Sequence, residues 1–185
     1  VCTACSPDGK VTPAMVESVL AIHADGGEHM VSPRLVYISD TTEIGTVYTK
    51  AELIALRHCC DEHGLLLFLD GARLGSALTS PESDLTLPEL AALTDVFTIG
   101  GTKNGMLFGE AMVIANPRLR ESFPFLIKER GGLMAKGRLL GAQFETAFAQ
   151  PDDGGEALYW RLARGANDNA LHLREGLNEL GFESY

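Results

Sequence analysis

Residues 65–73 read Leu-Leu-Leu-Phe-Leu-Asp-Gly-Ala-Arg, an unbroken apolar run that leads directly into a polar turn. A run of this kind, without polar alternation, is typical of a strand that is covered on both faces of a parallel sheet. The stretch therefore predicts a buried strand at Leu65–Leu69. This strand would deliver Asp70 and Arg73 to its carboxyl end.

Short apolar runs predict further strands at Leu35–Ile38, Val96–Ile99 and Met112–Ala115. The segments around these strands have the apolar spacing and the cap residues of amphipathic helices. Helices are expected at residues 13–24, from the capping box Thr49–Glu52 to Gly64, and at residues 88–93, 118–128, 133–149 and 155–180. Strands that alternate with helices indicate an α/β layered fold with a mostly parallel sheet.

Composition and charge restrict the class of protein. The 185 residues include 45% hydrophobic and 22% charged residues, which is the make-up of a soluble globular protein. The formal net charge of −10 argues against a nucleic-acid partner, because binding to a polyanion requires clustered Lys and Arg. No apolar run approaches the roughly 18 residues of a membrane span, so no membrane partner is expected.

The four cysteines fall as Cys2-x-x-Cys5 and the adjacent pair Cys59–Cys60. The first spacing is that of zinc ligands, but no second Cys-x-x-Cys or nearby His pair completes four ligands. The histidines show no pair with metal-ligand spacing and a matching carboxylate, so no metal site is expected. Reduced thiols in a cytoplasmic enzyme fit this pattern best.

Polar clusters follow three of the predicted strands, at Ser39–Glu43, Asp70–Arg73 and Thr102–Gly105. In open α/β sheets, ligands bind beyond the carboxyl ends of the strands. Because these ends meet at one edge of a parallel sheet, the three clusters together predict a pocket.

Lys103 is the candidate catalytic group of this pocket, and Asp70 is a candidate cofactor-binding group. A lysine that forms a Schiff base needs a partly desolvated site, which the end of a buried strand flanked by glycines would provide. A pyridine cofactor that accepts electrons needs a carboxylate beside its ring nitrogen, and Asp70 is placed for that role. The loop Gly100–Gly105 lacks the Gly-x-x-x-x-Gly-Lys-[Ser/Thr] order of a nucleotide-binding loop, which argues against ATP or GTP.

Four stretches, in this order along the chain, resemble the low-specificity L-threonine aldolase branch of the β-eliminating lyases. This family consists of pyridoxal-5′-phosphate (PLP) enzymes of the aspartate-aminotransferase fold. The stretches are Tyr-Ile-Ser-Asp-Thr-Thr-Glu-Ile-Gly-Thr at 37–46, Leu-Asp-Gly-Ala-Arg-Leu at 69–74, Ile-Gly-Gly-Thr-Lys-Asn-Gly at 99–105 and Lys-Gly-Arg-Leu-Leu-Gly at 136–141. The resemblance implies a three-layer PLP-binding large domain at residues 1–150. It also implies that residues 151–185 are a long helix leading into a truncated α+β small domain.

The resemblance also implies roles for individual residues. Lys103 would be the Schiff-base lysine, Asp70 would pair with the pyridinium nitrogen, and Thr102 would lie beside the cofactor. Arg73 would lie near the cofactor hydroxyl or the substrate carboxylate, to which its planar fork is suited. Thr42 and Glu43 would line the substrate side of the pocket.

The implied reaction is cleavage of threonine or allo-threonine, between Cα and Cβ, to glycine and an aldehyde. Two other functions stay open: β-elimination or transamination on another amino acid, and a non-catalytic scaffold of the same fold. A homodimer or homotetramer is expected, since sites of this fold borrow residues from a partner subunit. The family's N-terminal segment, which cups the PLP phosphate, has no counterpart here, so these 185 residues alone are expected to bind PLP weakly.

Overall fold

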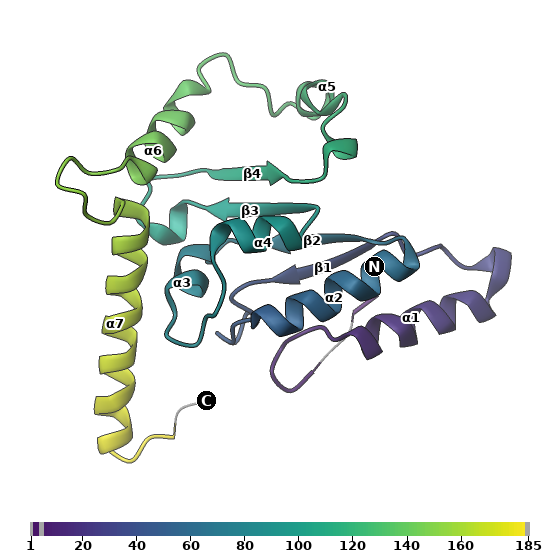
Figure 1. Ribbon diagram of the computed structural model, residues 1–185, viewed down its shortest axis with the longest axis horizontal. Coiled ribbons are helices and arrows are strands. Elements are labelled where there is room, and N and C mark those ends of the chain that lie inside the picture. The colour runs from purple at the N-terminus through teal and green to yellow at the C-terminus, as the bar shows by residue number, and fades with distance from the viewer. Residues whose placement is uncertain (1, 4–5, 184–185) are drawn as a thin grey trace.

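A four-stranded sheet with the order β1-β2-β3-β4 forms the centre of the protein (Figure 1). The computed structural model describes residues 2–3 and 6–183. The strands are β1 (Leu35–Ser39), β2 (Leu66–Asp70), β3 (Val96–Gly100) and β4 (Glu110–Ile114). The first three run parallel, and β4 pairs antiparallel with β3. The predicted α/β fold with a mostly parallel sheet is confirmed.

Helices connect the strands and extend beyond them. They are α1 (Pro13–Asp25), α2 (Lys50–His63), α3 (Leu74–Thr79), α4 (Leu87–Leu93), α5 (Phe123–Glu129), α6 (Arg138–Phe148) and α7 (Leu158–Glu179). Short 3-10 turns lie at η1 (Gly27–His29), η2 (Thr102–Asn104) and η3 (Pro117–Leu119). The figure shows α7 standing across one end of the sheet, and it packs there against α3 and η2.

The cap residues read from the sequence define the ends of α2. The Thr49 hydroxyl accepts a hydrogen bond from the Glu52 N–H at 3.3 Å, and the Glu52 carboxylate accepts one from the Thr49 N–H at 2.8 Å. Gly64 closes the helix in the left-handed conformation with φ of 63°. Each cap of this kind contributes about 1 kcal/mol, because it satisfies backbone groups that the helix leaves unpaired.

Three helix predictions were wrong in their bounds. The helix expected at 118–128 is divided into η3 and α5, because Ser122 lies between them with a left-handed φ of 61°. The helices expected from 133 and 155 begin later, at Arg138 and Leu158. Residues 135–137 form a turn before the first of these helices, and Ala157 has an extended ψ of 147° before the second, so neither helix starts earlier.

One face of the sheet carries the core. Val36, Ile38, Leu67 and Leu69 are buried on this face and belong to one apolar cluster with residues of α1, α2 and α4, among them Val16. The opposite face bears residues such as Leu35 and Tyr37, which are 48% and 53% exposed.

The expectation that residues 65–69 are covered on both faces is therefore not met within the described part of the chain. Burial in β2 alternates instead: Leu67 and Leu69 are buried, while Leu66 and Phe68 are half-buried. The helices that follow the parallel strands all contribute to the same apolar cluster, so they cover the same face. Tyr37 and Phe68 stack on the other face with ring centroids 5.4 Å apart.

The strand expected at 112–115 also differs from the prediction, both in its bounds and in its burial. It lies at Glu110–Ile114 and forms the edge of the sheet, with β3 as its neighbour. Met112 is 49% exposed, so β4 is not the buried strand that its apolar run indicates. Within the described residues, no helix combines the length and the apolar character needed to cross a bilayer.

Asp40 is a buried acid directly after β1. Its Oδ1 accepts a hydrogen bond from the Tyr48 N–H at 3.3 Å, whereas its buried Oδ2 has no hydrogen-bond partner among the described residues. Burial raises the pKa of this carboxyl from 3.8 to about 7, and the Tyr48 N–H opposes the shift. The fold therefore favours the protonated form of Asp40.

The substitution Asp40→Asn keeps the size of the side chain and removes its charge. Because the folded-state pKa is raised from 3.8 to about 7, the contribution of Asp40 to stability is present below pH 3.8 and is lost as the pH rises through 7. The free energy of unfolding of the variant, relative to that of the wild type, should therefore increase between pH 5 and pH 8, by up to about 3 kcal/mol. Chemical denaturation at both pH values measures this gain. An equal gain at both, or the same pH dependence in the exposed control Asp152→Asn, would contradict the explanation.

Candidate active site

The three predicted polar clusters meet at the carboxyl edge of the parallel strands. The Asp40 N–H donates to the Asp70 carbonyl oxygen at 3.0 Å, which joins the end of β1 to that of β2. The Gly100 N–H donates to the Gly71 carbonyl oxygen at 2.9 Å, which joins the end of β2 to that of β3. Backbone hydrogen bonds therefore hold all three clusters side by side, as the sequence predicts.

Two glycines allow the loops after β2 and β3 to approach this closely. A Cβ atom added at Gly71 would overlap the carbonyl oxygen of Thr98, and one added at Gly100 would overlap the backbone of Ala72. The Thr98 hydroxyl also accepts a hydrogen bond from the Gly71 N–H at 3.0 Å. The loop that carries Asp70 and the loop that carries Lys103 are thus tied together where no side chain would fit.

Asp70 is held in place from both sides of its carboxylate. Oδ1 accepts a hydrogen bond from the Ala72 N–H at 2.9 Å, and Oδ2 accepts one from the hydroxyl of Tyr37. Burial, together with the hydrogen bond to Asp70 and the charge of its carboxylate, raises the pKa of Tyr37 to about 12. Tyr37 therefore remains a protonated donor at neutral pH.

Sequence reasoning missed Tyr37 as a site residue. In the register of β1 and β2, Ser39 lies beside Asp70 and Tyr37 beside Phe68, so Tyr37 and Asp70 share a face of the sheet. The alternation of side chains along β1 and β2 would have placed Tyr37 on the same face as Asp70. This was not used because β2 was expected to be covered on both faces.

Arg73 and Glu43, both predicted to lie in the pocket, form an ion pair. The Arg73 Nη1 and the Glu43 Oε1 are 3.2 Å apart, and the Glu43 side chain is 78% exposed. Thr42, by contrast, is buried, and its hydroxyl bonds to that of Thr46 at 2.6 Å. The structure therefore brings Arg73 and Glu43 together, while the Thr42 hydroxyl is used within its own loop.

Lys103 and Thr102 lie on the turn η2 and are both exposed. The Lys103 ε-amine forms no hydrogen bond or ion pair with any residue between positions 6 and 183. The expected partial desolvation of Lys103 is thus not met within the described chain. The reason is that η2 turns Asn104, and not Lys103, toward the interior.

A series of buried hydrogen bonds holds the turn that contains Lys103 to α7. The Asn104 Nδ2 donates to the Tyr159 carbonyl oxygen at 3.0 Å, and the Tyr159 hydroxyl donates to the Gly100 carbonyl oxygen at 3.1 Å. A side chain at Gly75 would overlap the Asn104 amide, so α3 approaches this amide closely only because position 75 is glycine. These contacts link α7 to Gly100 before Lys103 and to Asn104 after it, and no local pattern in the sequence indicates them.

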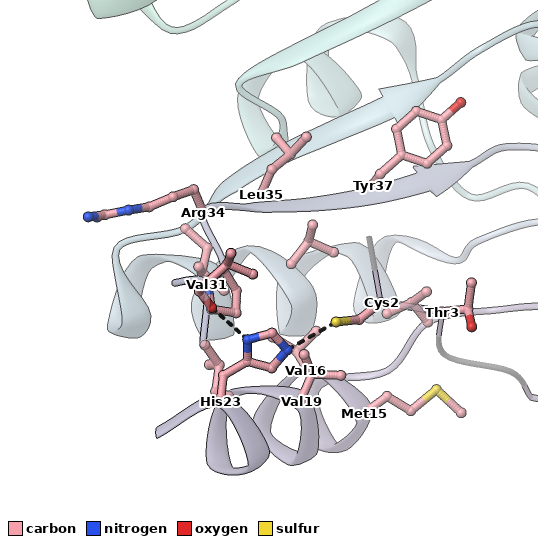
Figure 2. A pocket seen from close by; sticks show the side chains of 15 residues that line it. Cys2, Thr3, Met15, Val16, Val19, His23, Val31, Arg34, Leu35 and Tyr37 are labelled. Atoms are coloured by element: carbon pink, nitrogen blue, oxygen red, sulfur yellow. Dashed lines mark hydrogen bonds between the residues drawn. The ribbon is translucent and has the colours of Figure 1, made fainter. Parts of the chain in front are cut away.

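A pocket of about 630 Å³ lies between α1 and the edge strand β1, and Tyr37 is among its lining residues. Figure 2 shows its apolar lining, with Cys2 Sγ 3.1 Å from His23 Nε2 and His23 Nδ1 2.6 Å from the Val31 carbonyl oxygen. None of the predicted site residues lines this pocket, so the convergent polar groups at the strand ends are the better candidate for a catalytic site. Cys5, the partner of Cys2 in the zinc-like spacing, lies outside the described residues.

Comparison with known proteins relates the chain to an enzyme family. The chain is 42% identical over 143 residues to a low specificity L-threonine aldolase of Pseudomonas sp., and 40% identical over 134 residues to one of Pseudomonas aeruginosa. These matches cover 76% and 72% of this chain, but only 40% and 38% of the relatives. The chain therefore spans about two fifths of the length of the curated relatives that it matches.

The fold leads to the same family. The structure resembles that of Leishmania major threonine aldolase with a TM-score of 0.90 and 52% sequence identity, covering 98% of this chain and 51% of that one. The resemblance inferred from four short stretches is confirmed over nearly the whole chain, since the family model for β-eliminating lyases matches residues 2–183. The chain belongs to the β-eliminating lyase family.

Proposed function

We propose that the protein is a PLP-dependent aldehyde-lyase that cleaves threonine or allo-threonine to glycine and an aldehyde. The relatives that it matches at 40% identity or more bear the name threonine aldolase. The observation that carries the proposal is the backbone tie between Gly71 and Gly100, because it sets the Asp70 and Lys103 loops side by side. One ligand could then contact a carboxylate, an amine and the Arg73 guanidinium together.

The residues at this edge fit the cofactor by their chemistry. Lys103 would hold it covalently through an ε-amine that has no ion-pair partner in the described chain. The Asp70 carboxylate, which accepts a hydrogen bond from the Tyr37 hydroxyl, would accept one from a protonated ring nitrogen of the cofactor. When bound, PLP supplies the electron sink that bond cleavage at Cα requires.

Arg73 would bind the carboxylate of the amino-acid substrate. Its present partner, Glu43, is largely exposed, and an exposed ion pair contributes only about 0–1 kcal/mol. A substrate carboxylate could therefore replace Glu43 at small cost and gain two parallel hydrogen bonds from the guanidinium. Release of Glu43 would leave its carboxylate beside the bound substrate.

Two features of the whole protein belong to the same proposal. A homodimer or homotetramer would explain how the exposed Lys103 turn becomes enclosed, with a partner subunit covering it. The cysteines at positions 2, 59 and 60 are free thiols, which supports a reducing compartment such as the cytoplasm.

A second reaction is supported by the family itself, whose model is described as β-eliminating lyase. A serine or cysteine substrate would then release pyruvate instead of an aldehyde. Parallel assays of aldehyde release from threonine and pyruvate release from serine separate the two functions. Dominant pyruvate release would replace the first proposal with the second.

Lys103→Ala should abolish covalent attachment of PLP. Borohydride reduction of the full-length protein with PLP, followed by peptide mapping, should label Lys103 in the wild type and leave the variant unlabelled. Aldehyde release should fall by at least about 10³-fold, the scale on which loss of a covalent catalyst acts. Lys128→Ala, which changes another exposed lysine, should keep both label and activity. Labelling of a different lysine in the wild type would overturn the assignment.

Arg73→Lys tests the proposed carboxylate contact. Lysine keeps the charge but replaces the planar fork with a point donor, so one charged hydrogen bond is lost. Such a bond is worth about 1.5–3 kcal/mol, and KM for threonine should rise roughly 10- to 100-fold. The matched control is Arg164→Lys, which changes an arginine paired at 2.8 Å with Glu156 on the surface. An unchanged KM in Arg73→Lys, or an equal rise in the control, would refute the contact.

A further inference from the structure

Three side chains with metal-binding atoms meet between α1 and α2, away from the proposed active site. They are Glu17 on α1 and Cys59 and His63 on α2, and one ligand atom from each lies within 4.8 Å of the other two. Cys59 and His63 are four residues apart and so share a helix face. His63 ends α2 just before β2 begins at Leu66, so the group lies toward the amino end of the strands.

The packing of α1 on α2 creates this group. Figure 1 shows the two helices side by side, and they are in contact. A groove of about 420 Å³ runs along them and is lined by residues that include Glu17 and Cys59. Cys59 is only 3% exposed but lines the groove, and Glu17 and His63 are exposed.

The electrostatic surroundings favour a cation. Cys59 is buried, and the carboxylates of Glu17 and Glu62 are the negative charges that act on its sulfur. The last turn of α2 adds the partial negative charge of a helix carboxyl end. A divalent cation would outweigh the negative charges around Cys59 and stabilise its thiolate, and the thiol proton would be released to solvent.

The donor atoms select among divalent ions. Thiolate sulfur with imidazole nitrogen suits Zn²⁺, whereas Mg²⁺ and Ca²⁺ prefer oxygen ligands alone. In a tetrahedral Zn²⁺ site the ligand atoms lie roughly 3.5 Å apart, as follows from bond lengths of about 2.0–2.3 Å. The exposed side chains of Glu17 and His63 would need to close by at most about an ångström to reach this spacing, and a water molecule would complete the four ligands.

We propose that Glu17, Cys59 and His63 bind a Zn²⁺ ion that clamps α1 to α2. Such a clamp would matter because α1 is held to the core by one buried residue, Val16, with Leu20 partly buried beside the same cluster. The ion would join the residue after Val16 directly to the helix that covers β2. The effect would be on stability, since none of the three side chains lies at the carboxyl edge of the strands.

Thermal unfolding of the metal-free full-length protein tests the clamp. Addition of Zn²⁺ should raise Tm in a saturable way, and a chelator should reverse the rise. Co²⁺ in place of Zn²⁺ should give thiolate-to-cobalt charge-transfer absorption. Cys59→Ser should abolish this absorption, and His63→Ala and Glu17→Gln should weaken binding by at least about tenfold, since changes in the outer shell of a metal site alone reach that size.

His58→Ala is the matched control. His58 lies on the same helix and pairs with Glu62 at 3.3 Å, but it is not one of the three ligands. This variant should keep both the Tm rise and the cobalt absorption. If Cys59→Ser fails to fold, the exposed variants His63→Ala and Glu17→Gln decide the outcome. A Tm rise that survives in these variants, or that His58→Ala removes as well, would overturn the proposal.

Discussion

The close contact between the loops after β2 and β3 is the constraint on which the site depends. The hydrogen bond from the Gly100 N–H to the Gly71 carbonyl oxygen forms only because neither residue has a Cβ. Two parallel strands stand about 4.8 Å apart, so loops that stay at this spacing leave little room for a side chain between them. Here the glycines keep the loops together, so an acid and an amine that are 33 positions apart reach one edge of the sheet.

The remainder of the chain supports that contact from two directions. The capped helices α2 and α4 cover one face of the sheet and fix the position of the strands. From the strand ends, α7 supplies the Tyr159 hydroxyl and carbonyl groups, which bond to Gly100 and Asn104. Since buried polar groups are costly when unpaired, any displacement of α7 would leave these groups unsatisfied. The position of the Lys103 turn is therefore coupled to a helix that follows it by more than 50 residues.

Sequence patterns predicted the parts of the structure that depend on local signals. The capping box at Thr49 and the apolar runs located helices and strands, and the polar clusters after three strands located the edge where the site lies. Tyr37 and Asn104 were not predicted, because their contacts depend on strand register and on packing between distant segments. Exposure was also misjudged: periodicity reports which residues are apolar, but not whether a layer of protein covers them.

The exposed state of Lys103 follows from the same geometry. Of the three residues of η2, Asn104 is the buried one, and it holds the turn to α7. Position and desolvation are thus supplied by different parts of the site. The fold provides position, through Asn104 and the paired glycines. In the proposed role of Lys103, enclosure of the side chain would come from whatever covers η2. The fold positions Lys103 before any ligand or partner binds, and a ligand or partner that covers this edge would then change the reactivity of the amine.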